Sequence, residues 1–231
     1  MESTPVQTAQ PLPADPYTMR QTAIGFKSKG LSLEGVLAFP NDIPGPHPAL
    51  LVCHPHPLFG GDMESPVVTA ICGAAGAEGI ASLRFNFRGV GDSEGEFANG
   101  DGEQEDLKSA LNVLRRWPGI DGKRIAVAGY SFGASVVLDG LKHCKTAKCF
   151  ALVAPTISSA KSETAGRDRR PRLFVVGQRD GLVPSVELQR VLDDMKSPAQ
   201  LFEVREADHG LAGSENIVAR RVAEFISQGL T

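Results

Sequence analysis

The sequence predicts an α/β protein with a mostly parallel, twisted sheet of about eight strands and helices on both faces. From residue 49 onward, short apolar runs alternate with segments of helical periodicity, an order typical of such sheets. Two apolar runs on either side of Gly30 predict an antiparallel hairpin that opens the sheet. A Gly-x-Ser-x-Gly turn at 129–133 joins an apolar run to a helical pattern, as expected where a buried strand passes into its helix.

The expected elements follow from the spacing of apolar residues and from the turn residues between them. Short runs that are apolar throughout or at alternate positions predict strands at 22–29, 31–39, 49–53, 80–87, 124–128, 148–154, 172–177 and 200–205. Apolar residues at helical intervals predict helices at 66–77, 103–117, 134–141, 185–195 and 214–228. Ser65 and Ser185 are expected to cap two of these helices. The polar segment 155–171 has no periodicity and predicts a loop.

Length and composition limit the kind of protein this is. The 231 residues suit one domain at 21–231, with a flexible tail at 1–20, where four prolines and no apolar core argue against a signal peptide. Hydrophobic residues make up 42% and charged residues 22%, which is ordinary for a soluble globular protein. The net charge of −3 argues against a nucleic-acid partner. No apolar run reaches the roughly 18 residues that membrane insertion needs.

Cysteine usage indicates the redox setting. The four cysteines are too few, and too apolar in their surroundings, to form a disulfide framework. We expect free thiols and a cytoplasmic location. A local bridge between Cys144 and Cys149 is the alternative.

Two segments suggest a phosphate or anion site, and neither has the required pattern. The glycine-rich stretch 89–95 lacks the Lys-Ser/Thr of a phosphate-binding loop, and its glycine spacing does not match the dinucleotide fingerprint. The basic cluster at 167–172 is interrupted by Asp168 and Pro171, so we expect a solvated loop there rather than an anion site.

The turn Gly129-Tyr130-Ser131-Phe132-Gly133 is the most informative part of the chain. A serine on so sharp a turn is expected at positive φ, and the flanking glycines leave room for strand and helix to approach each other. The hydroxyl of Ser131 would then stand clear of the sheet, with the first amides of the next helix aimed at the same point. The plainer alternative is that Ser131 only fills a tight turn.

Ser131, Asp180 and His209 each follow a predicted strand, in the order Ser…Asp…His. Loops at the carboxyl ends of parallel strands meet at one edge of a sheet, so we expect these side chains to lie close together. A serine hydroxyl needs a base to become nucleophilic, histidine accepts a proton near neutral pH, and a carboxylate orients the imidazole. Two alternatives remain. Asp180 is a turn residue before Gly181, or Asp208 is the acid, although it would have to fold back to reach the neighbouring ring.

Acyl transfer also needs two hydrogen-bond donors for the developing oxyanion. One is expected from the amide of Phe132, directly after the serine. The other is expected from the loop that begins at His54, where two prolines have no N–H. This leaves the amides of His56, Leu58 and Phe59. The two histidines of that loop are interpreted as structural rather than as metal ligands, because no carboxylate or third histidine accompanies them.

Four motifs occur together in this chain. They are Cys-His-Pro-His-Pro-x-x-Gly-Gly at 53–61, Arg-Phe-Asn-Phe-Arg-Gly-Val-Gly-x-Ser at 84–93, Gly-Tyr-Ser-Phe-Gly at 129–133 and Ala-Asp-His-Gly at 207–210. The combination resembles the small α/β-hydrolases without a cap domain that are grouped near dienelactone hydrolase. The resemblance extends over residues 22–229, although dienelactone hydrolase itself has a cysteine where this chain has Ser131.

The resemblance implies an α/β-hydrolase fold without a cap domain, since 155–171 is too short to hold one. It implies a metal-free and cofactor-free serine hydrolase, with Arg88 and Asp92 bracing the loop beside the site. It also implies the site residues themselves. The triad would consist of Ser131, Asp180 and His209. By the family's His-Gly-x pattern, the oxyanion hole would consist of the amides of Phe132 and His56.

We therefore expect a serine hydrolase that cleaves small carboxylic esters through an acyl-Ser131 intermediate. The expectation of small substrates rests on the missing cap, which would leave little apolar wall for a long chain. The alternatives are a peptidase or thioesterase acting through the same triad, and a non-catalytic ligand-binding protein with this fold. The expected partner is a small-molecule ester, and the sequence leaves a homodimer open.

Overall fold

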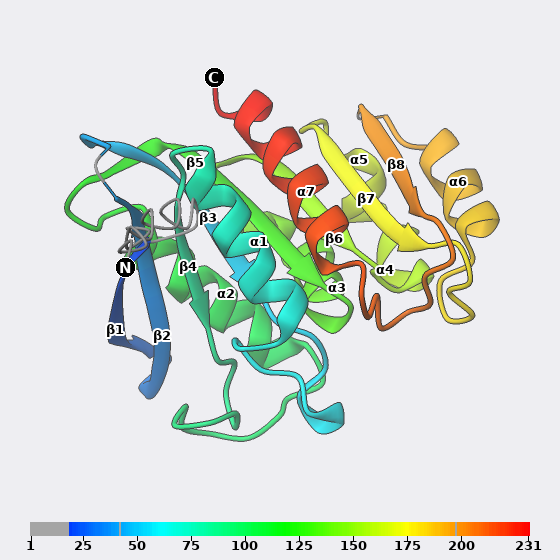
Figure 1. Ribbon diagram of the computed structural model, residues 1–231. Helices are drawn as coiled ribbons and strands as arrows, with labels where there is room; N and C mark the ends of the chain where they lie inside the picture. Colours follow the sequence, from blue (N-terminus) through cyan, green and yellow to red (C-terminus); the bar gives the residue numbers. More distant parts are fainter. Residues whose placement is uncertain (1–18, 42, 197) are drawn as a thin grey trace, which may run out of the picture.

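A computed structural model of the chain describes residues 19–231, except residues 42 and 197. Its centre is one eight-stranded sheet (Figure 1). The strands are β1 (Met19–Ser28), β2 (Leu31–Pro40), β3 (His47–Cys53), β4 (Ala81–Phe85), β5 (Ile120–Tyr130), β6 (Ala147–Val153), β7 (Arg172–Gly177) and β8 (Ala199–Val204). The helices are α1 (Pro66–Ala77), α2 (Asp101–Leu114), α3 (Phe132–Asp139), α4 (Ile157–Ala160), α5 (Glu163–Arg167), α6 (Ser185–Asp193) and α7 (Glu215–Gly229), with the 3₁₀ turns η1 (Pro57–Phe59) and η2 (Leu141–His143).

The strand order across the sheet is β1-β2-β4-β3-β5-β6-β7-β8. Strands β1 and β2 form the antiparallel hairpin, and β2 also runs antiparallel to β4. Every other pair in the sheet is parallel. The predicted fold, a mostly parallel sheet that opens with an antiparallel hairpin, is confirmed.

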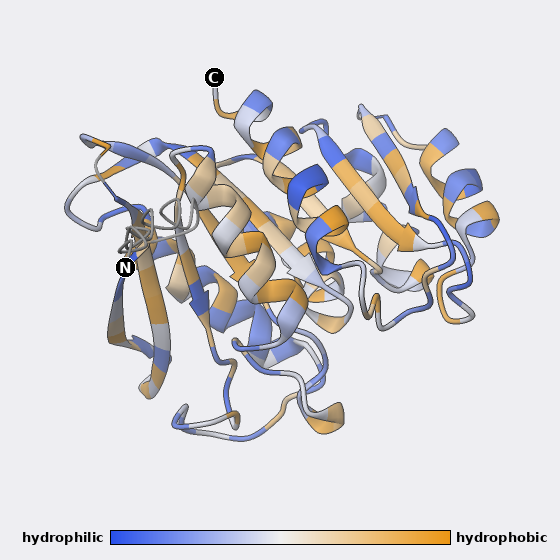
Figure 2. Ribbon diagram, in the orientation of Figure 1, coloured by the Kyte–Doolittle hydropathy of each residue, from blue (hydrophilic) through white to orange (hydrophobic). Residues whose placement is uncertain are grey.

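Helices cover both faces of the sheet. Helices α1 and α7 lie side by side on one face, while α2, α3 and α6 pack against the other (Figure 1). Each face has its own hydrophobic core. In β3, Leu50 and Val52 belong to the core beneath α1 and α7, and Leu51 belongs to the core beneath α2, α3 and α6. A strand covered on both faces needs apolar residues at every position, which explains its continuous apolar run. Figure 2 shows that β7 is largely apolar, for the same reason. In α7, it shows hydrophilic and hydrophobic residues in alternating bands.

Two expectations about segment boundaries need correction. Most of the tail predicted for 1–20 lies outside the described residues, and Met19 and Arg20 belong to β1. The segment 155–171, expected as a loop, contains the short helices α4 and α5. Helices of four and five residues are too short to leave an apolar repeat in the sequence.

Of the two expected serine caps, Ser65 is the N-cap of α1, although its side chain makes no capping hydrogen bond, and Ser185 is not a cap. The bounds of α1 agree with the prediction, because Pro66 occupies the first helical position, where its missing N–H does no harm. The hydroxyl of Ser65 accepts a hydrogen bond from Asp62 N at 3.2 Å instead of from the helix. Pro184 is the N-cap of α6, so Ser185 lies within that helix.

The basic cluster at 167–172 is only in part the solvated loop that was expected, because Arg167 and Arg169 are exposed but Arg172 is not. The side chain of Arg172 is 0% exposed. Its guanidinium donates to the carbonyl oxygen of Ala165 at 2.6 Å and to that of Asp168. The last carbonyls of a helix have no partner within it, so the C-terminal end of α5 supplies the acceptors that a buried guanidinium requires. Arg170 also pairs with Asp168, and the two arginines fasten α5 to the sheet.

All four cysteines are free and buried. Burial raises the pKa of the Cys144 and Cys149 thiols to about 12, so both stay protonated at neutral pH. The predicted free thiols are confirmed, and the local bridge between these two residues is absent. In the part of the chain that the structure describes, no helix combines the length and hydropathy needed to cross a bilayer.

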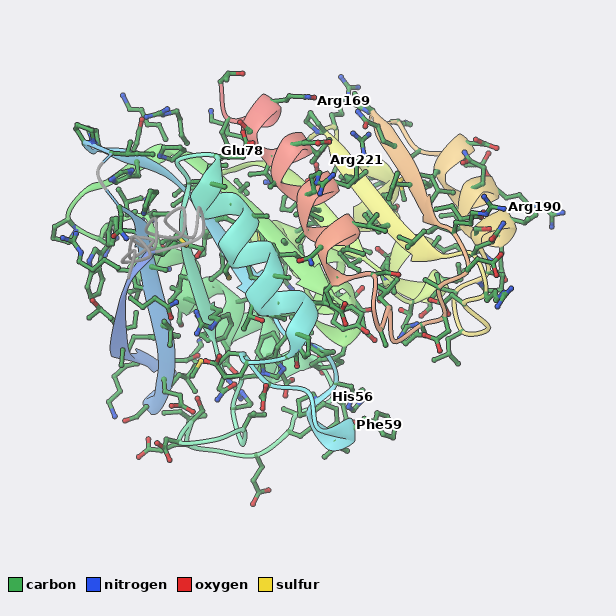
Figure 3. All side chains as sticks on the ribbon, in the orientation of Figure 1. His56, Phe59, Glu78, Arg169, Arg190 and Arg221 are labelled. Carbon is green, nitrogen blue, oxygen red and sulfur yellow. The ribbon has the colours of Figure 1, made fainter. Side chains whose placement is uncertain are left out.

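Replacing Arg172 should destabilise the fold. Arg172→Ala leaves the carbonyl oxygens of Ala165 and Asp168 without this donor and removes the charge 3.6 Å from the Asp168 carboxylate, which keeps Arg170 as its remaining partner. We expect the free energy of unfolding to fall by about 3 to 5 kcal/mol in urea titrations followed by circular dichroism. Arg169 lies in the same segment and is exposed (Figure 3), so Arg169→Ala should change it by less than about 0.5 kcal/mol. Equal effects of the two substitutions would contradict this account.

Candidate active site

Ser131 stands on a sharp turn between β5 and α3. Its backbone has φ of 51° and ψ of −114°, so the positive φ predicted for this serine is confirmed. A Cβ added at Gly129 would lie 2.6 Å from Ala134 N, and one at Gly133 would lie 2.5 Å from the carbonyl oxygen of Cys53. Neither position has room for a side chain. The two glycines therefore let α3 approach both β5 and the end of β3.

Three side chains meet at the carboxyl edge of the sheet. Ser131 Oγ lies 2.9 Å from His209 Nε2, and His209 Nδ1 lies 2.8 Å from Asp180 Oδ2. Asp180 follows β7 and His209 follows β8, so the parallel strands bring together residues that are far apart in the sequence. The hydroxyl, the imidazole and the carboxylate form one continuous line of hydrogen bonds.

The carboxyl group of Asp180 is fully buried, with 0% of its side chain exposed. Burial by itself would raise its pKa, but the hydrogen bond with His209 and those from the amides of Val183 and Leu182 outweigh burial and lower the pKa below its usual value. The two amides donate to Oδ1 at 2.8 and 2.9 Å. Asp180 is therefore a carboxylate at neutral pH, with one oxygen held by the backbone and the other facing the imidazole.

The loop that carries His209 is held by neighbouring polar groups. Asp208, the alternative acid, accepts a hydrogen bond from Gly210 N at 2.9 Å, and its exposed side chain serves that turn rather than the ring. The hydroxyl of Tyr130 donates to the carbonyl oxygens of His209 and Gly210 at 3.0 and 3.1 Å. Burial raises the pKa of Tyr130 to about 12, so the hydroxyl keeps its proton and remains a donor. The sequence analysis missed Tyr130, because nothing near it in the sequence indicates such distant partners.

A second hydroxyl network lies beside the serine turn, and it too was missed. Ser135 Oγ donates to the carbonyl oxygen of Ser131 at 3.3 Å and accepts from Thr156 N at 3.0 Å. Thr156 Oγ1 in turn lies 3.0 Å from Ser159 Oγ. These hydrogen bonds tie the start of α3 to the loop after β6 and satisfy the hydroxyls with protein partners.

The amide of Phe132 begins α3, where an N–H has no partner within the helix. In the loop after β3, Leu58 N donates to His56 Nδ1 at 3.2 Å and Phe59 N donates to His56 O at 3.1 Å. Of the three amides considered in this loop, that of His56 is the one without an acceptor among the described residues. The rings of His56 and Phe132 are in contact, with centroids 4.9 Å apart. The structure thus leaves the two predicted amides free on residues that touch each other.

His54 has a structural role, as interpreted from the sequence. Its Nδ1 lies 2.7 Å from Pro55 O, and its Nε2 accepts from Phe87 N at 3.0 Å, so the ring joins the loops after β3 and β4. Burial lowers the pKa of His54 to about 4, and a proton on Nε2 would face the Phe87 N–H. Within the described residues, no three His, Cys, Asp or Glu side chains gather to hold a metal ion.

The loop after β4 is braced by Arg88, but not by the side chain of Asp92 as the resemblance implied. The guanidinium of Arg88 forms hydrogen bonds of 2.9 and 2.8 Å to Asp106 on α2. Asp92 contributes through its backbone, donating to Glu34 Oε1 at 2.8 Å, and its side chain is exposed. The partner of Arg88 thus lies on the following helix rather than within the glycine-rich loop.

A cavity of about 730 Å³ opens beside Ser131. Among the described residues, its lining is mostly apolar, contains no Lys or Arg, and includes Glu215 as its one carboxylate. The 3₁₀ turn η1 contributes Phe59, and the turn after β7 contributes Leu182 and Val183. The expectation that a site without a cap has little apolar wall is therefore wrong for this chain.

A serine at the turn after the central strand β5, in a sheet of this topology, is the architecture of the α/β hydrolases. The family described as "Alpha/beta hydrolase domain" matches residues 48–223, and the chain belongs to this family. The chemistry that the family indicates is hydrolysis.

Solved structures agree with this family. An α/β serine hydrolase homologue from Coxiella burnetii is 30% identical, with a TM-score of 0.75 over 91% of this chain and 97% of that chain. An α/β serine hydrolase without a lid from Xanthomonas campestris is 25% identical, with a TM-score of 0.79 over 95% of this chain and 97% of that chain. The predicted α/β-hydrolase fold without a cap domain is confirmed.

A curated relative is less informative about function. An uncharacterized protein of Rickettsia prowazekii (strain Madrid E) is 35% identical over 112 residues, which are 48% of this chain and 47% of that protein. The chain spans less than half the length of the curated relatives it matches.

The buried neutral ring of His54 should make the fold acid-sensitive. Its pKa is about 4 in the folded protein and near 6.5 when unfolded, so the unfolded chain binds more protons below pH 6.5 and stability falls as the pH drops. Between about pH 7 and pH 4.5 this group alone should remove about 2 to 3 kcal/mol from the free energy of unfolding. In His54→Asn, the decrease in the free energy of unfolding over this pH range, measured by urea titration, should be smaller by that amount. Equal falls in the variant and the wild type would contradict the assignment.

Proposed function

We propose that this chain is a serine hydrolase that cleaves carboxylic esters through an acyl-Ser131 intermediate. In this proposal Ser131, His209 and Asp180 form the catalytic triad. The observation that carries it is the continuous line of hydrogen bonds from Ser131 Oγ through the imidazole to a buried carboxylate. The strained turn adds support, because backbone strain of this kind is concentrated at functional sites.

Acylation begins with proton transfer from the serine. His209 Nε2 accepts the proton of Ser131 Oγ while that oxygen attacks the carbonyl carbon of the ester. Asp180 accepts the hydrogen bond from Nδ1–H, which fixes the tautomer and stabilises the imidazolium. The carbonyl oxygen becomes an oxyanion, for which the amides of His56 and Phe132 are the proposed donors.

The tetrahedral intermediate collapses when the bond between the carbonyl carbon and the leaving oxygen breaks. His209 gives its proton to that oxygen, the alcohol departs, and the acyl group remains on Ser131. Water then attacks the same carbon while His209 accepts its proton. Ser131 Oγ leaves and takes the proton back, and the carboxylic acid is released. Each side chain returns to its starting state without an added cofactor.

The alternatives differ in the leaving group or in the absence of turnover. A thioesterase for coenzyme A esters would have to bind the negatively charged coenzyme A. The cavity lining has a carboxylate and no Lys or Arg, and this charge pattern favours an uncharged ester. A peptidase would use the same triad, and a ligand-binding protein would hold its ligand without cleaving it. Rates on p-nitrophenyl esters, acyl-coenzyme A and aminoacyl amides separate these possibilities. The cytoplasmic location and a homodimer stay predictions.

Removing the nucleophile should abolish turnover. We expect Ser131→Ala to lower the rate of p-nitrophenyl ester hydrolysis about a thousandfold or more, because Ser131 Oγ is the one hydroxyl that the described residues place within hydrogen-bonding distance of His209 Nε2. The far-ultraviolet circular dichroism should stay that of the wild type. A fluorophosphonate probe should label the wild-type serine and leave the variant unlabelled. Unchanged hydrolysis by the folded variant would defeat the proposal.

Tyr130 is a positioning residue in this mechanism. Tyr130→Phe keeps the ring but removes the hydroxyl that holds the carbonyls of His209 and Gly210. We expect kcat to fall about five- to tenfold, the equivalent of one net hydrogen bond, with KM changed less than about twofold. Labelling of Ser131 by the fluorophosphonate probe should slow in parallel at a temperature where both proteins are folded. A lower melting temperature with unchanged labelling would show that the hydroxyl is only structural.

A further inference from the structure

We infer that the site prefers esters whose acyl group is a medium-length apolar chain, of about four to eight carbons, over acetyl esters. The chain would lie between Phe59 and Leu182, two exposed side chains that take the place of the absent cap. This inference rests on the proposed ester hydrolysis and names the class of acyl group for it.

The first support is where exposed apolar side chains lie. Phe59 is 86% exposed and Leu182 is 72% exposed, and both line the cavity beside Ser131. Large apolar side chains that stay in water beside a concave site are typical of ligand-binding surfaces. The other large exposed apolar side chains in the described chain lie outside the cavity lining. They are Ile43, Leu58, Val186 and Ile217.

The wall formed by Phe59 is continuous with the proposed oxyanion donors. The ring of Phe59 lies 4.9 Å from that of His56, which lies 4.9 Å from that of Phe132, both measured between centroids. A row of aromatic rings thus runs from the edge of the cavity to the residue next to the serine (Figure 3 labels His56 and Phe59). The amides of His56 and Phe132 would hold the carbonyl oxygen, so the chain on that carbonyl carbon starts against these rings. The same carbon also carries the alcohol oxygen, which His209 must reach to protonate it, so we assign the wall at Phe59 and His56 to the acyl group.

A second part of the wall, at Leu182, is placed by the same carboxylate that orients the imidazole. Leu182 N donates to Asp180 Oδ1 at 2.9 Å, so the backbone under the Leu182 side chain is fixed. Val183 follows and also lines the cavity, but it is 1% exposed and belongs to the core, whereas the side chain of Leu182 stays exposed. Leu182 is therefore an apolar contact held in place by the turn that presents the triad acid.

The charge of the lining disfavours a negatively charged acyl group. Glu215 repels a second carboxylate, and the lining has no Lys or Arg to pair with one. The hydroxyls of Ser135 and Thr156 also line the cavity, but they bond to each other at 3.1 Å. They therefore do not require a polar ligand, and the remaining surface suits hydrocarbon.

The test compares p-nitrophenyl acetate, butyrate, hexanoate and octanoate below their solubility limits. Complete burial of one methylene group is equivalent to about a fourfold increase in kcat/KM. A chain that lies in an open groove is only partly buried and gains part of this increase. We therefore expect kcat/KM to rise about tenfold or more from acetate to hexanoate. Phe59→Ala and Leu182→Ala should each lower kcat/KM for hexanoate about fivefold and for acetate less than about twofold.

Two matched controls accompany these variants. Leu58 is 68% exposed and adjoins Phe59, and Val186 is 66% exposed and lies four positions after Leu182, yet neither lines the cavity. Leu58→Ala and Val186→Ala should therefore leave the chain-length profile of the wild type unchanged. A change equal to that of the test variants would overturn the inference, since general apolar surface and not the cavity wall would then set the preference.

The outcomes separate this inference from the proposed function. A flat or falling acyl series in an enzyme whose Ser131 still reacts with the fluorophosphonate probe overturns the chain preference and leaves ester hydrolysis standing. Absence of turnover on every ester, with Ser131 unlabelled, defeats the proposed function itself. Acetyl esters of butanol, hexanol and octanol, followed by acid release, form the second series. Dependence on alcohol length without dependence on acyl length overturns the assignment of the wall to the acyl group.

Discussion

The left-handed backbone of Ser131 is the constraint on which the arrangement of the site depends. A non-glycine residue in this region carries strain of about 1 to 3 kcal/mol, and its surroundings hold it there. Ser131 N donates to Val153 O at 2.7 Å, and Gly129 and Gly133 admit neighbouring backbones more closely than any side chain would allow. Strand β5 therefore passes into α3 at this one residue, and the hydroxyl has a fixed place around which the loops after β3, β7 and β8 are arranged.

These loops are held mainly by buried polar groups, whereas the sheet is held by apolar packing. Asn86 accepts a hydrogen bond from Met63 N at 2.8 Å and donates to Glu34 Oε1 at 2.6 Å, which joins the loops after β3 and β4 to the hairpin. His54 bonds to Phe87 N and to its own loop in the same region. Hydrogen bonds fix direction as well as distance. Polar contacts of this kind can therefore hold a peptide N–H at one orientation beside the serine, which apolar contacts alone would not do.

The sequence was informative wherever the structure depends on local periodicity or on turn chemistry. Strands covered on both faces leave continuous apolar runs, Pro66 marks the start of α1, and the residues following β5, β7 and β8 can be selected because parallel strands end together. Other features depend on partners that are distant in sequence. Arg172 looks polar in its local context, and only the carbonyls at the end of α5 explain its burial. The partners of Tyr130 lie 79 and 80 residues away, beyond any local pattern.

The fastening of α5 to the sheet also bears on how this scaffold can be engineered. Inserting a tag or a domain within 155–171 would pull a buried guanidinium away from its two carbonyls. The tip of the hairpin is different: Lys29 and Gly30 are exposed, and a Cβ added at Gly30 meets nothing within 4 Å. Exposed hairpin tips of this kind tolerate insertions well. A fusion partner is thus best inserted at the β1–β2 turn, where it lengthens the turn without breaking the contacts that hold α5 and the fold around Ser131 in place.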